Sequence, residues 1–384
     1  MLYPLSYGRS IVRKALVYQS FWRIPVSVMA QRRDQQAPLS AVRIIASCRE
    51  RSTPLLVRPR QQGAPNVWQE GKRKCGVREA LAGRPAVGAV TAKGKRMATV
   101  LITGTSTGIG FATALAFGRA GHKVAAAMRN PVRAPELAKV VSQEKLDVTV
   151  CTMDVDVDAS VSDAMGRIAK KVGPIDVLVN NAGIDRTGSV EELPLDDFRA
   201  VMETNYFGVI RCVQAVLPAM RQRRSGCIVN VASVAGHIAM SPMAPYAASK
   251  FALEALSECL AQEAKPFNIR VAILEPGIID TQMAQHISID QGASPYPQQH
   301  RVAALFRSAL TNPVPPTVVA EKVLEIAVSG TWQLRHPVGP DAIPFLGWRK
   351  AMSHDEWVAW GALDDDAWYD RVKADFGMDA RPRA

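Results

Sequence analysis

The sequence of 384 residues lacks the cysteine patterns of a disulfide framework or a metal site. Its six cysteines form no C-x-x-C motif and have no histidine at metal-ligand spacing. We therefore expect no bound metal, and thiols that are reduced and mostly buried. This favours a reducing compartment, so we expect a cytoplasmic protein. The cysteines are Cys48, Cys75, Cys151, Cys212, Cys227 and Cys259.

The sequence also has no apolar run that would suit a membrane-spanning helix. Its longest stretch without Lys, Arg, Asp or Glu covers residues 225–249 and holds Asn230, His237, two prolines and several serines. Such a composition is typical of a strand and a loop, whereas a membrane span needs about 20 predominantly apolar residues. No transmembrane helix is predicted.

Most of the chain lacks an excess of positive charge, although the net charge of the whole is +12. Residues 1–96 carry 19 Lys and Arg against 4 Asp and Glu, a net charge of +15, whereas residues 97–384 carry 28 against 31, a net charge of −3. A surface that binds nucleic acid or anionic lipid is expected to be basic. The charge pattern therefore predicts neither a nucleic-acid partner nor a membrane partner for residues 97–384.

Residues 1–96 are rich in Arg, Pro and Gln and show no sustained helical or strand period. We expect a disordered basic extension, or upstream sequence read from a misassigned start codon. Met97 would then be the true start, because an apolar strand begins directly after it. Two alternatives stay open. One is an organelle transit peptide, although the length and the Trp and Pro content argue against it, and the other is a basic arm that contacts nucleic acid or anionic lipid.

From Met97 onward, apolar β-rich runs alternate with helix-sized segments. Near-continuous apolar strands separated by helices are typical of a parallel sheet covered on both faces. The sequence therefore predicts an α/β protein with a doubly wound Rossmann fold of about seven strands, in one domain that spans residues 97–340. Strands are expected at residues 100–103, 124–128, 148–153, 177–179, 227–231, 269–274 and 334–338, and helices at 111–120, 159–172, 198–223, 246–264 and 317–328.

The C-terminal tail, residues 341–384, has a different composition. It interleaves Trp348, Trp357, Trp360 and Trp368 with an acidic run. The spacing of these tryptophans fits a helical stripe only in part. We expect the aromatic side chains to pack on the main domain or on a neighbouring subunit, with a dedicated partner site as the alternative.

A glycine-rich turn follows the first predicted strand. Gly104, Gly108 and Gly110 come directly after apolar residues and directly before a helix, the context that a phosphate-binding loop requires. Glycines let the backbone approach a pyrophosphate, and the helix N-terminus offers N–H groups to it. The turn predicts a dinucleotide site, and an ordinary glycine-bearing β–α turn is the alternative.

The end of the second predicted strand has no Asp or Glu that would bind a free ribose 2′-hydroxyl and repel a phosphate. Arg129 stands there instead, where a guanidinium could hold a 2′-phosphate in a bidentate manner, and Ser106 could add a hydroxyl. The pattern predicts that NADP(H) is the preferred cofactor. NAD(H) is the alternative if Arg129 is only a solvated surface charge.

Tyr246 and Lys250 stand four residues apart on a predicted helix and so share one face. An ammonium beside a phenol would favour the ionised phenol and lower its pKa. Such a pair indicates a general base that works near neutral pH. Taken alone, a Tyr near a Lys on a helix is usually a surface pair, so this interpretation depends on the other motifs.

Together these motifs resemble the short-chain dehydrogenase/reductase (SDR) family in its single-domain form, nearest the branch that contains 17β-hydroxysteroid and retinol dehydrogenases. Residues 103–110 are similar to the family's cofactor loop, and residues 180–183, Asn-Asn-Ala-Gly, to its central-strand motif. Asp154 and Val155 look like its adenine-pocket pair. The resemblance implies that the cofactor is bound by Gly104, Ser106, Thr107, Gly108, Ile109, Gly110, Arg129, Asp154, Val155, Asn181, Ala182, Gly183, Tyr246, Lys250, Pro276, Gly277 and Thr281.

The same resemblance implies a catalytic tetrad of Asn205, Ser233, Tyr246 and Lys250. A carbonyl carbon that receives hydride leaves charge on its oxygen, so a proton donor must meet that oxygen while a second donor polarises it. Tyr246 is expected to be the proton donor, or the base in oxidation, and Ser233 the polarising group. By family analogy, Lys250 also bonds the nicotinamide ribose, and Asn205 anchors a water that relays protons through Lys250.

We therefore expect an NADP(H)-dependent oxidoreductase that transfers hydride between nicotinamide and a lipophilic secondary alcohol or ketone, or an alcohol or aldehyde. Residues 278–316 occupy the place of the family's mobile substrate lid, and apolar side chains such as Met283, Tyr296 and Phe306 would line its pocket. The resemblance also implies a homodimer or homotetramer. Two alternative functions stay open: a non-catalytic NADP-binding sensor or regulator, and an SDR-type epimerase or dehydratase.

Overall fold

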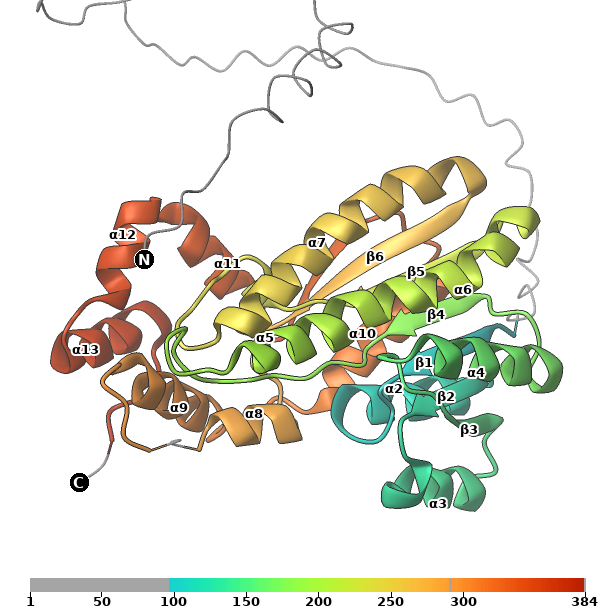
Figure 1. Ribbon diagram of the computed structural model, residues 1–384, viewed down its shortest axis with the longest axis horizontal. Coiled ribbons are helices and arrows are strands. Elements are labelled where there is room, and N and C mark those ends of the chain that lie inside the picture. Colours follow the sequence, from blue (N-terminus) through green and yellow to red (C-terminus); the bar gives the residue numbers. More distant parts are fainter. Residues whose placement is uncertain (1–96, 290–291, 383–384) are drawn as a thin grey trace, which may run out of the picture. The chain divides into compact units, whose positions relative to one another are not determined.

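The computed structural model describes residues 97–289 and 292–382, so the expectations for residues 1–96 lie outside the described residues. A seven-stranded parallel sheet organises the chain, in the order β3-β2-β1-β4-β5-β6-β7 (Figure 1). This arrangement confirms the predicted α/β doubly wound fold. The strands are β1 (Thr99–Thr103), β2 (Lys123–Met128), β3 (Val148–Thr152), β4 (Val177–Asn180), β5 (Gly226–Val231), β6 (Ile269–Pro276) and β7 (Arg335–Val338).

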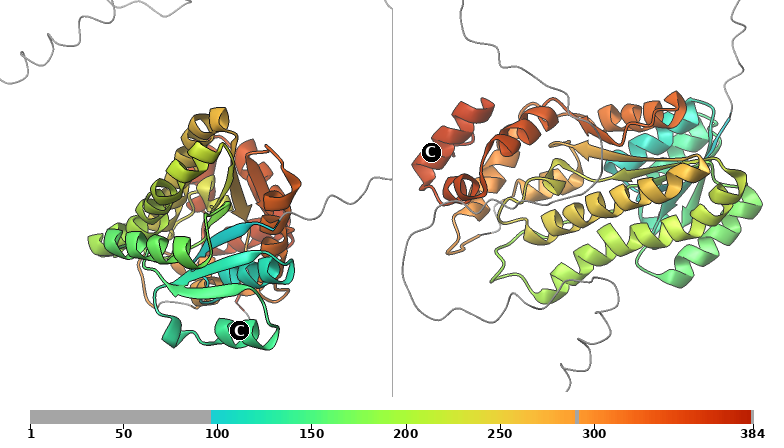
Figure 2. Two further views of the ribbon diagram at one scale, coloured as in Figure 1. Left: turned by 90° about the vertical axis from the view of Figure 1, so that its right-hand side faces the viewer. Right: turned by 90° about the horizontal axis from the view of Figure 1, so that it is seen from above.

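Each face of the sheet has its own layer of helices (Figure 2). Successive side chains of a strand point to opposite faces, so a continuous apolar strand supplies both cores. In β1, Leu101 packs toward one layer, while Val100 and Ile102 pack toward the other. The first layer contains α4 (Asp158–Lys171), α6 (Gly208–Arg223) and α7 (Ala244–Ala264), and the second α2 (Gly108–Arg119), α3 (Glu136–Gln143) and α10 (Pro316–Ser329).

The helix predicted over residues 198–223 is interrupted. The structure has α5 (Leu195–Met202), then a π-helical turn η2 (Glu203–Phe207), and then α6. A π turn inserts extra backbone into a helix and is frequent at functional sites. Here it carries Asn205, which is only 1% exposed. The sequence did not reveal the turn, because its residues keep a helical composition.

The strand order reverses between β1 and β4, which are neighbours although β2 and β3 separate them in the sequence. In open α/β sheets a ligand binds in the crevice at the carboxyl ends of the strands at such a point. The short 3-10 turns η1 (Pro131–Arg133) and η3 (Val234–Gly236) follow β2 and β5 at this edge, and η4 (Lys265–Phe267) ends α7.

The lid region and the C-terminal tail are helical and pack together (Figure 1). Trp360, Trp368 and Tyr369 of the tail belong to one buried cluster with Leu305 of the lid. In the same region, Asp365 pairs with the buried Arg301 through an Nε–Oδ1 distance of 2.6 Å. The helices are α8 (Gln282–Ile287) and α9 (Gln298–Ala309) in the lid, and α11 (Ala342–Ala351), α12 (His354–Gly361) and α13 (Asp365–Phe376) in the tail. Across the described ranges, no helix is long and apolar enough to cross a membrane.

The four cysteines of the described ranges are unpaired. Cys212 and Cys227 are buried, Cys151 is half-buried, and Cys259 is exposed. Burial raises the pKa of the Cys151 thiol to about 11 and that of Cys212 to about 12. Both thiols therefore stay protonated and unreactive at neutral pH.

Candidate active site

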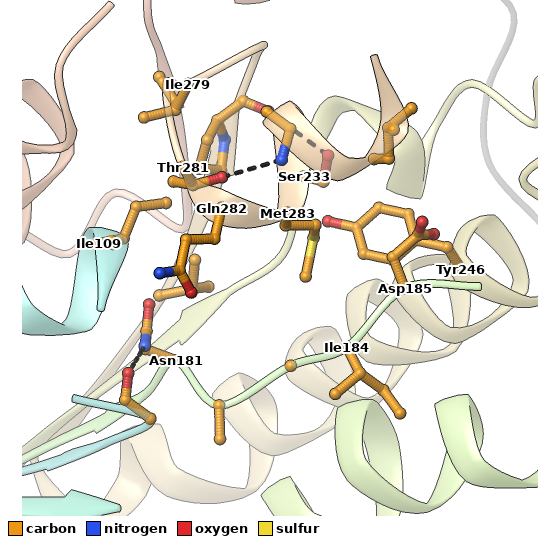
Figure 3. Close-up of a pocket in the computed structure, with 18 of the residues that line it drawn as sticks. Ile109, Asn181, Ile184, Asp185, Ser233, Tyr246, Ile279, Thr281, Gln282 and Met283 are labelled. Atoms are coloured by element: carbon orange, nitrogen blue, oxygen red, sulfur yellow. Dashed lines mark hydrogen bonds between the residues drawn. The ribbon is translucent and has the colours of Figure 1, made fainter. Parts of the chain in front are cut away.

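A cavity of about 1010 Å³ lies at the carboxyl edge of the sheet (Figure 3). It brings together segments that are far apart in the sequence: the glycine-rich turn, the ends of β2 to β6, the lid and the tail. Of the seventeen residues predicted to bind the cofactor, Gly110 does not line the cavity; the lining ones are Gly104, Ser106, Thr107, Gly108, Ile109, Arg129, Asp154, Val155, Asn181, Ala182, Gly183, Tyr246, Lys250, Pro276, Gly277 and Thr281.

The glycine-rich turn has a geometry that side chains would block. Gly104 has a φ of +69°, and a Cβ built on it would lie 2.7 Å from the Cα of Ala182. At Gly110 a Cβ would lie 2.2 Å from the carbonyl oxygen of Gly104 and 2.4 Å from the amide nitrogen of Asn181. Gly110 is therefore required for close packing of α2 under the turn, and Gly104 for the turn itself.

The N-terminus of α2 is free to meet a ligand. Thr107 is its N-cap residue, its side chain makes no capping hydrogen bond within the described residues, and no acidic residue lies in the first turn. Backbone N–H groups and the positive end of the helix dipole therefore face the cavity. The space at the N-terminus of α2, which a Cβ on a residue of the glycine-rich turn would fill, fits the diphosphate of a dinucleotide.

Asn181 holds the turn in place from the end of β4. Its side-chain amide donates hydrogen bonds to the carbonyl oxygens of Thr103 at 2.9 Å and Gly104 at 3.0 Å. Its backbone N–H donates to the Thr103 hydroxyl at 3.0 Å. Asn181 thus lines the cavity, and its side chain positions the phosphate-binding turn.

Two arginines stand at the far end of the cavity, beyond β2. Arg129 and Arg133 are both exposed and both line the cavity, as do Asp154 and Val155. Arg133 was not predicted from the sequence, and it lies at the end of η1, the turn that follows β2. Its position four residues after Arg129 is the sequence feature that could have indicated it.

Ser233, Tyr246 and Lys250 meet at the middle of the cavity. Ser233 follows β5 as the N-cap of η3, and its hydroxyl accepts a hydrogen bond from the N–H of Ala235 at 3.1 Å. Lys250 is buried, and its ammonium donates to the carbonyl oxygen of Val231 at 2.9 Å and lies 5.4 Å from the centroid of the Tyr246 ring. Figure 3 shows the phenol ring of Tyr246 and the side chain of Ser233 among the residues that line the cavity.

The expected lowering of the Tyr246 pKa by Lys250 is wrong for this structure. Removal of water by the surrounding protein raises the pKa of the Tyr246 phenol, the charge of Asp185 raises it further, and the hydrogen bond with Ser233 lowers it only in part. Burial also lowers the pKa of the Lys250 ammonium to about 8. Sequence spacing indicated the pair but not its desolvation, which is the largest cause of the raised pKa. Tyr246 is therefore protonated at neutral pH, the form that donates a proton.

Asn205 does not line the cavity but lies behind it. Its side-chain oxygen accepts from the N–H of Ile184 at 2.8 Å, and its amide donates to the Ile184 carbonyl and to the Ser249 hydroxyl, both at 2.9 Å. The Ser249 hydroxyl in turn donates to the carbonyl oxygen of Tyr246 at 2.7 Å. Asn205 thus ties the loop after β4 to the helix that carries Tyr246, and a role in water relay stays a prediction.

A charged cluster that was not predicted from the sequence lies at the end of η3, the turn that follows Ser233. Nε2 of His237 is 2.9 Å from Oε1 of the buried Glu275, and Glu254 receives Nε of Arg335 at 3.0 Å. The two carboxylates raise the pKa of His237 to about 9. The acids stand 17 and 38 residues from His237 in sequence, so no spacing pattern predicted them. His237 and Arg335 supply positive charge to these two acids.

Another part of the cavity wall is apolar and comes from the lid and the tail. Met283, Ile287, Leu305 and Phe306 line it as the lid was expected to do. Tyr296, which was predicted to line the pocket, is exposed instead, as is Ile289 of the lid, and Val302 of the lid is buried in a core cluster. The tail adds aromatic rings that sequence analysis did not place here. They are Phe345, Trp348 and Phe376, whose ring centroids lie 4.7 to 4.8 Å apart in T-shaped pairs.

Comparisons with known proteins identify the family of the chain. The family model described as short chain dehydrogenase matches residues 98–292. The chain is 36% identical over 251 residues to oxidoreductase BOA17 of Botryotinia fuckeliana, covering 64% of this chain and 90% of that protein. It is 41% identical over 189 residues to retinol dehydrogenase 8 of Bos taurus, covering 48% of this chain and 60% of that protein.

A solved structure is also similar to this chain. It is a gluconate 5-dehydrogenase from Burkholderia cenocepacia J2315 in complex with NADP and tartrate, with a TM-score of 0.57 and 28% identity over 64% of this chain and 95% of that chain. The chain belongs to the short-chain dehydrogenase family, as predicted, and is an oxidoreductase with a nicotinamide cofactor. The match to retinol dehydrogenase 8 supports the predicted branch.

Proposed function

We propose that the protein transfers hydride between NADP(H) and a lipophilic substrate, with Tyr246 as the general acid and base. The substrate pair is a secondary alcohol and its ketone, or an alcohol and its aldehyde. One observation carries the proposal. A continuous cavity joins the phosphate-binding turn to Ser233, Tyr246 and Lys250, and then to a wall of apolar lid and tail side chains. A carbonyl held at Tyr246 would thus have the cofactor on one side and apolar surface on the other.

The protein's own groups fit the proton chemistry of reduction. The bound nicotinamide supplies the hydride for the carbonyl carbon. The Tyr246 phenol, kept protonated by its surroundings, donates its proton to the carbonyl oxygen, and the hydroxyl of Ser233 polarises that oxygen. In oxidation the phenolate takes the proton back. Lys250 would hold the nicotinamide ribose, and its ammonium stabilises the transient phenolate.

The proposal is tested with a homologous series of methyl ketones and aldehydes, incubated with the full chain and NADPH while NADPH absorbance is followed. We expect kcat/KM to rise roughly 3- to 4-fold for each added methylene, until the apolar wall is covered, because each buried methylene contributes about 0.8 kcal/mol. Gluconate-like polar carbonyls serve as the matched controls and are expected to react poorly. No turnover of any carbonyl, or a preference for the polar ones, would contradict the proposal.

The preference for NADPH is proposed from the arginines at the end of β2. Replacement of Arg129 by Asp is expected to raise the KM for NADPH by about 100-fold, because a 2′-phosphate would lose a charge-assisted hydrogen bond and meet a carboxylate. The KM for NADH should change by less than about threefold, since a 2′-hydroxyl can donate to the new acid. Steady-state kinetics with both cofactors measure the change.

A matched control makes the same Arg-to-Asp substitution at a position outside the cavity. Arg199 of α5 lies outside the cavity lining, and its side chain is 69% exposed and pairs with Asp196. Arg199→Asp is expected to leave both KM values unchanged. An equal loss for NADPH and NADH in Arg129→Asp, or a wild-type preference for NADH, would overturn the proposed preference.

The proposal includes association into a homodimer or homotetramer. The family resemblance implies contact through the helices that carry Asn205 and Tyr246. Exposed aromatic residues on these segments support it: Phe207 of η2 is 45% exposed and Phe251 of α7 is 43% exposed.

A further inference from the structure

We propose that Trp348 of the C-terminal tail determines substrate specificity by packing against an aromatic ring that the substrate carries away from its reacting carbonyl. This inference rests on the proposed function and narrows its substrate class. The substrate would be an arylalkyl ketone or aldehyde, or the corresponding alcohol, rather than one with a purely aliphatic chain. The observation behind it is a pair of half-buried rings, Trp348 and Phe376, that line the same cavity as Tyr246.

The tail is fastened to the active site at the point where α11 begins. Asp341, the N-cap residue of α11, accepts a hydrogen bond from the backbone N–H of Ile278 at 2.7 Å. Gly277 leaves room for this carboxylate, because a Cβ on Gly277 would collide with it. α11 also contacts η3, the turn that Ser233 caps. The helix that carries Trp348 therefore has a defined position relative to the catalytic groups.

Contacts within the tail hold the indole of Trp348 in one orientation. Its Nε1 donates a hydrogen bond to Oδ2 of Asp375 at 3.2 Å. Its ring makes T-shaped contacts with Trp357, Trp360 and Phe376, at centroid distances of 5.5, 5.1 and 4.7 Å. A side chain that is already fixed loses little freedom when a ligand packs on it, so this part of the wall is preorganised for binding.

The two rings also keep surface that a ligand can cover. Trp348 and Phe376 line the cavity, whereas Trp357, Trp360 and Trp368 of the same cluster do not. Neither Trp348 nor Phe376 is fully buried. Because the indole N–H is already bonded to Asp375, the surface that Trp348 offers to a ligand is that of an apolar aromatic ring.

Met240 connects the rings of the tail with the catalytic tyrosine. It packs on two buried clusters, one with Trp348 at its edge and the other with Tyr246 at its edge. Met283 also packs on the second cluster, and Figure 3 shows its side chain beside the phenol of Tyr246. Both methionines line the cavity. Since thioether sulfur makes favourable contacts with aromatic rings, these side chains favour the same kind of ligand as Trp348 does.

A wall of this kind distinguishes an aromatic ring from a saturated one. Aromatic rings contact one another edge to face or offset, and such pairs contribute free energy beyond the area that they bury. A saturated ring of similar shape gains only from the buried area. A ring bound at Trp348 would also fix the end of the substrate away from the carbonyl, which helps to orient that carbonyl at Tyr246.

The experiment compares phenyl ketones with their cyclohexyl analogues, using NADPH and the full chain. The phenyl ketones are 4-phenylbutan-2-one, 6-phenylhexan-2-one and 8-phenyloctan-2-one, and each is paired with the ketone in which cyclohexyl replaces phenyl. For at least one chain length we expect the wild type to show a kcat/KM about 3- to 10-fold higher for the phenyl ketone than for its partner. The cyclohexyl group has the larger apolar surface, so burial of area alone predicts the opposite order.

Two substitutions at one position separate the aromatic contact from general damage. Trp348→Leu removes the ring, so the ratio of phenyl to cyclohexyl kcat/KM should fall to about 1 or below. Trp348→Phe also shortens the side chain and loses the bond to Asp375, but it keeps a ring and should keep most of the preference. Trp357→Leu removes a ring that contacts Trp348 outside the cavity lining, and the ratio should stay as in the wild type.

Two results would overturn the inference. One is a wild-type ratio of about 1 or below for every chain length. The other is the same ratio in Trp348→Leu and Trp348→Phe, because the presence of a ring at this position would then make no difference.

Failure of the proposed function would look different, because no ketone of either kind would then be reduced. In that case binding decides the inference. The alcohols that correspond to each pair are titrated by calorimetry into the wild type, Trp348→Phe and Trp348→Leu in the presence of NADP⁺. Binding of a phenyl alcohol about 3-fold or more tighter than that of its cyclohexyl partner, in the wild type and Trp348→Phe alone, supports Trp348 as the contact. Equal binding within every pair, or no binding of any alcohol, overturns it.

Discussion

Replacement of Tyr246 by Phe is expected to lower kcat for carbonyl reduction with NADPH by about 10²- to 10⁴-fold, the usual contribution of a positioned general acid. The change removes one oxygen and keeps the ring that faces the cavity. The binding of NADPH should therefore change by less than about threefold, since the phosphate-binding turn and Lys250 keep their contacts. Steady-state kinetics give kcat, and titration calorimetry gives the Kd for NADPH.

A second tyrosine of the same region provides the control. Tyr206 lies on η2, next to Asn205, and is outside the cavity lining. Tyr206→Phe removes the same atom and is expected to leave kcat and the Kd for NADPH unchanged. A Tyr246→Phe variant with full turnover would exclude Tyr246 as the acid. If the wild type bound NADPH but turned over no carbonyl, a non-catalytic sensor would be the better explanation.

The sheet was predictable because its order depends on local patterns. Each strand is a short apolar run buried on both faces, and each is followed by a helix, so parallel pairing follows from the alternation. The predicted strands agree with the observed ones to within about two residues. The glycine-rich turn was equally local: Gly104 and Gly110 stand where a strand meets a helix, and the backbone geometry there excludes a Cβ.

The walls of the cavity were less predictable, because they depend on contacts between distant segments. Trp348 and Phe376 reach the cavity only because α11 and α13 pack near α9. The tail did carry a local signal that was overlooked: Ser353 and Glu356 form a capping box that starts α12. Such a signal predicts a helix but not the surface on which the helix lies.

Charges in the site were the hardest to predict, because they depend on burial. The Tyr246–Lys250 spacing correctly indicated neighbouring groups, but the loss of water around both reverses the expected direction for the phenol pKa. No residue pattern in one sequence reports how deeply a side chain is buried.

Replacement of Gly110 by Ala is expected to raise the KM for NADPH by about 100-fold, because a small displacement of bound groups can cost that much. The new Cβ would lie 2.2 Å from the carbonyl oxygen of Gly104 and 2.4 Å from the amide of Asn181. The backbone oxygen cannot move alone, so the turn must shift, and the Asn181 bonds to Thr103 and Gly104 must lengthen. The free energy of unfolding should fall by about 1–3 kcal/mol, as for an overpacked core.

A glycine in a helix with open space around it gives the matched control. Gly166 lies within α4, is exposed, and a Cβ there would meet no atom within 4 Å. Gly166→Ala is expected to leave the KM for NADPH unchanged and to raise the free energy of unfolding by about 0.4–1 kcal/mol, because alanine loses less backbone entropy on folding. Kinetics and urea unfolding of both variants measure the contrast. If Gly110→Ala bound NADPH as tightly as Gly166→Ala does, the prediction would be wrong. The diphosphate site would then not require the close packing of the turn against Asn181.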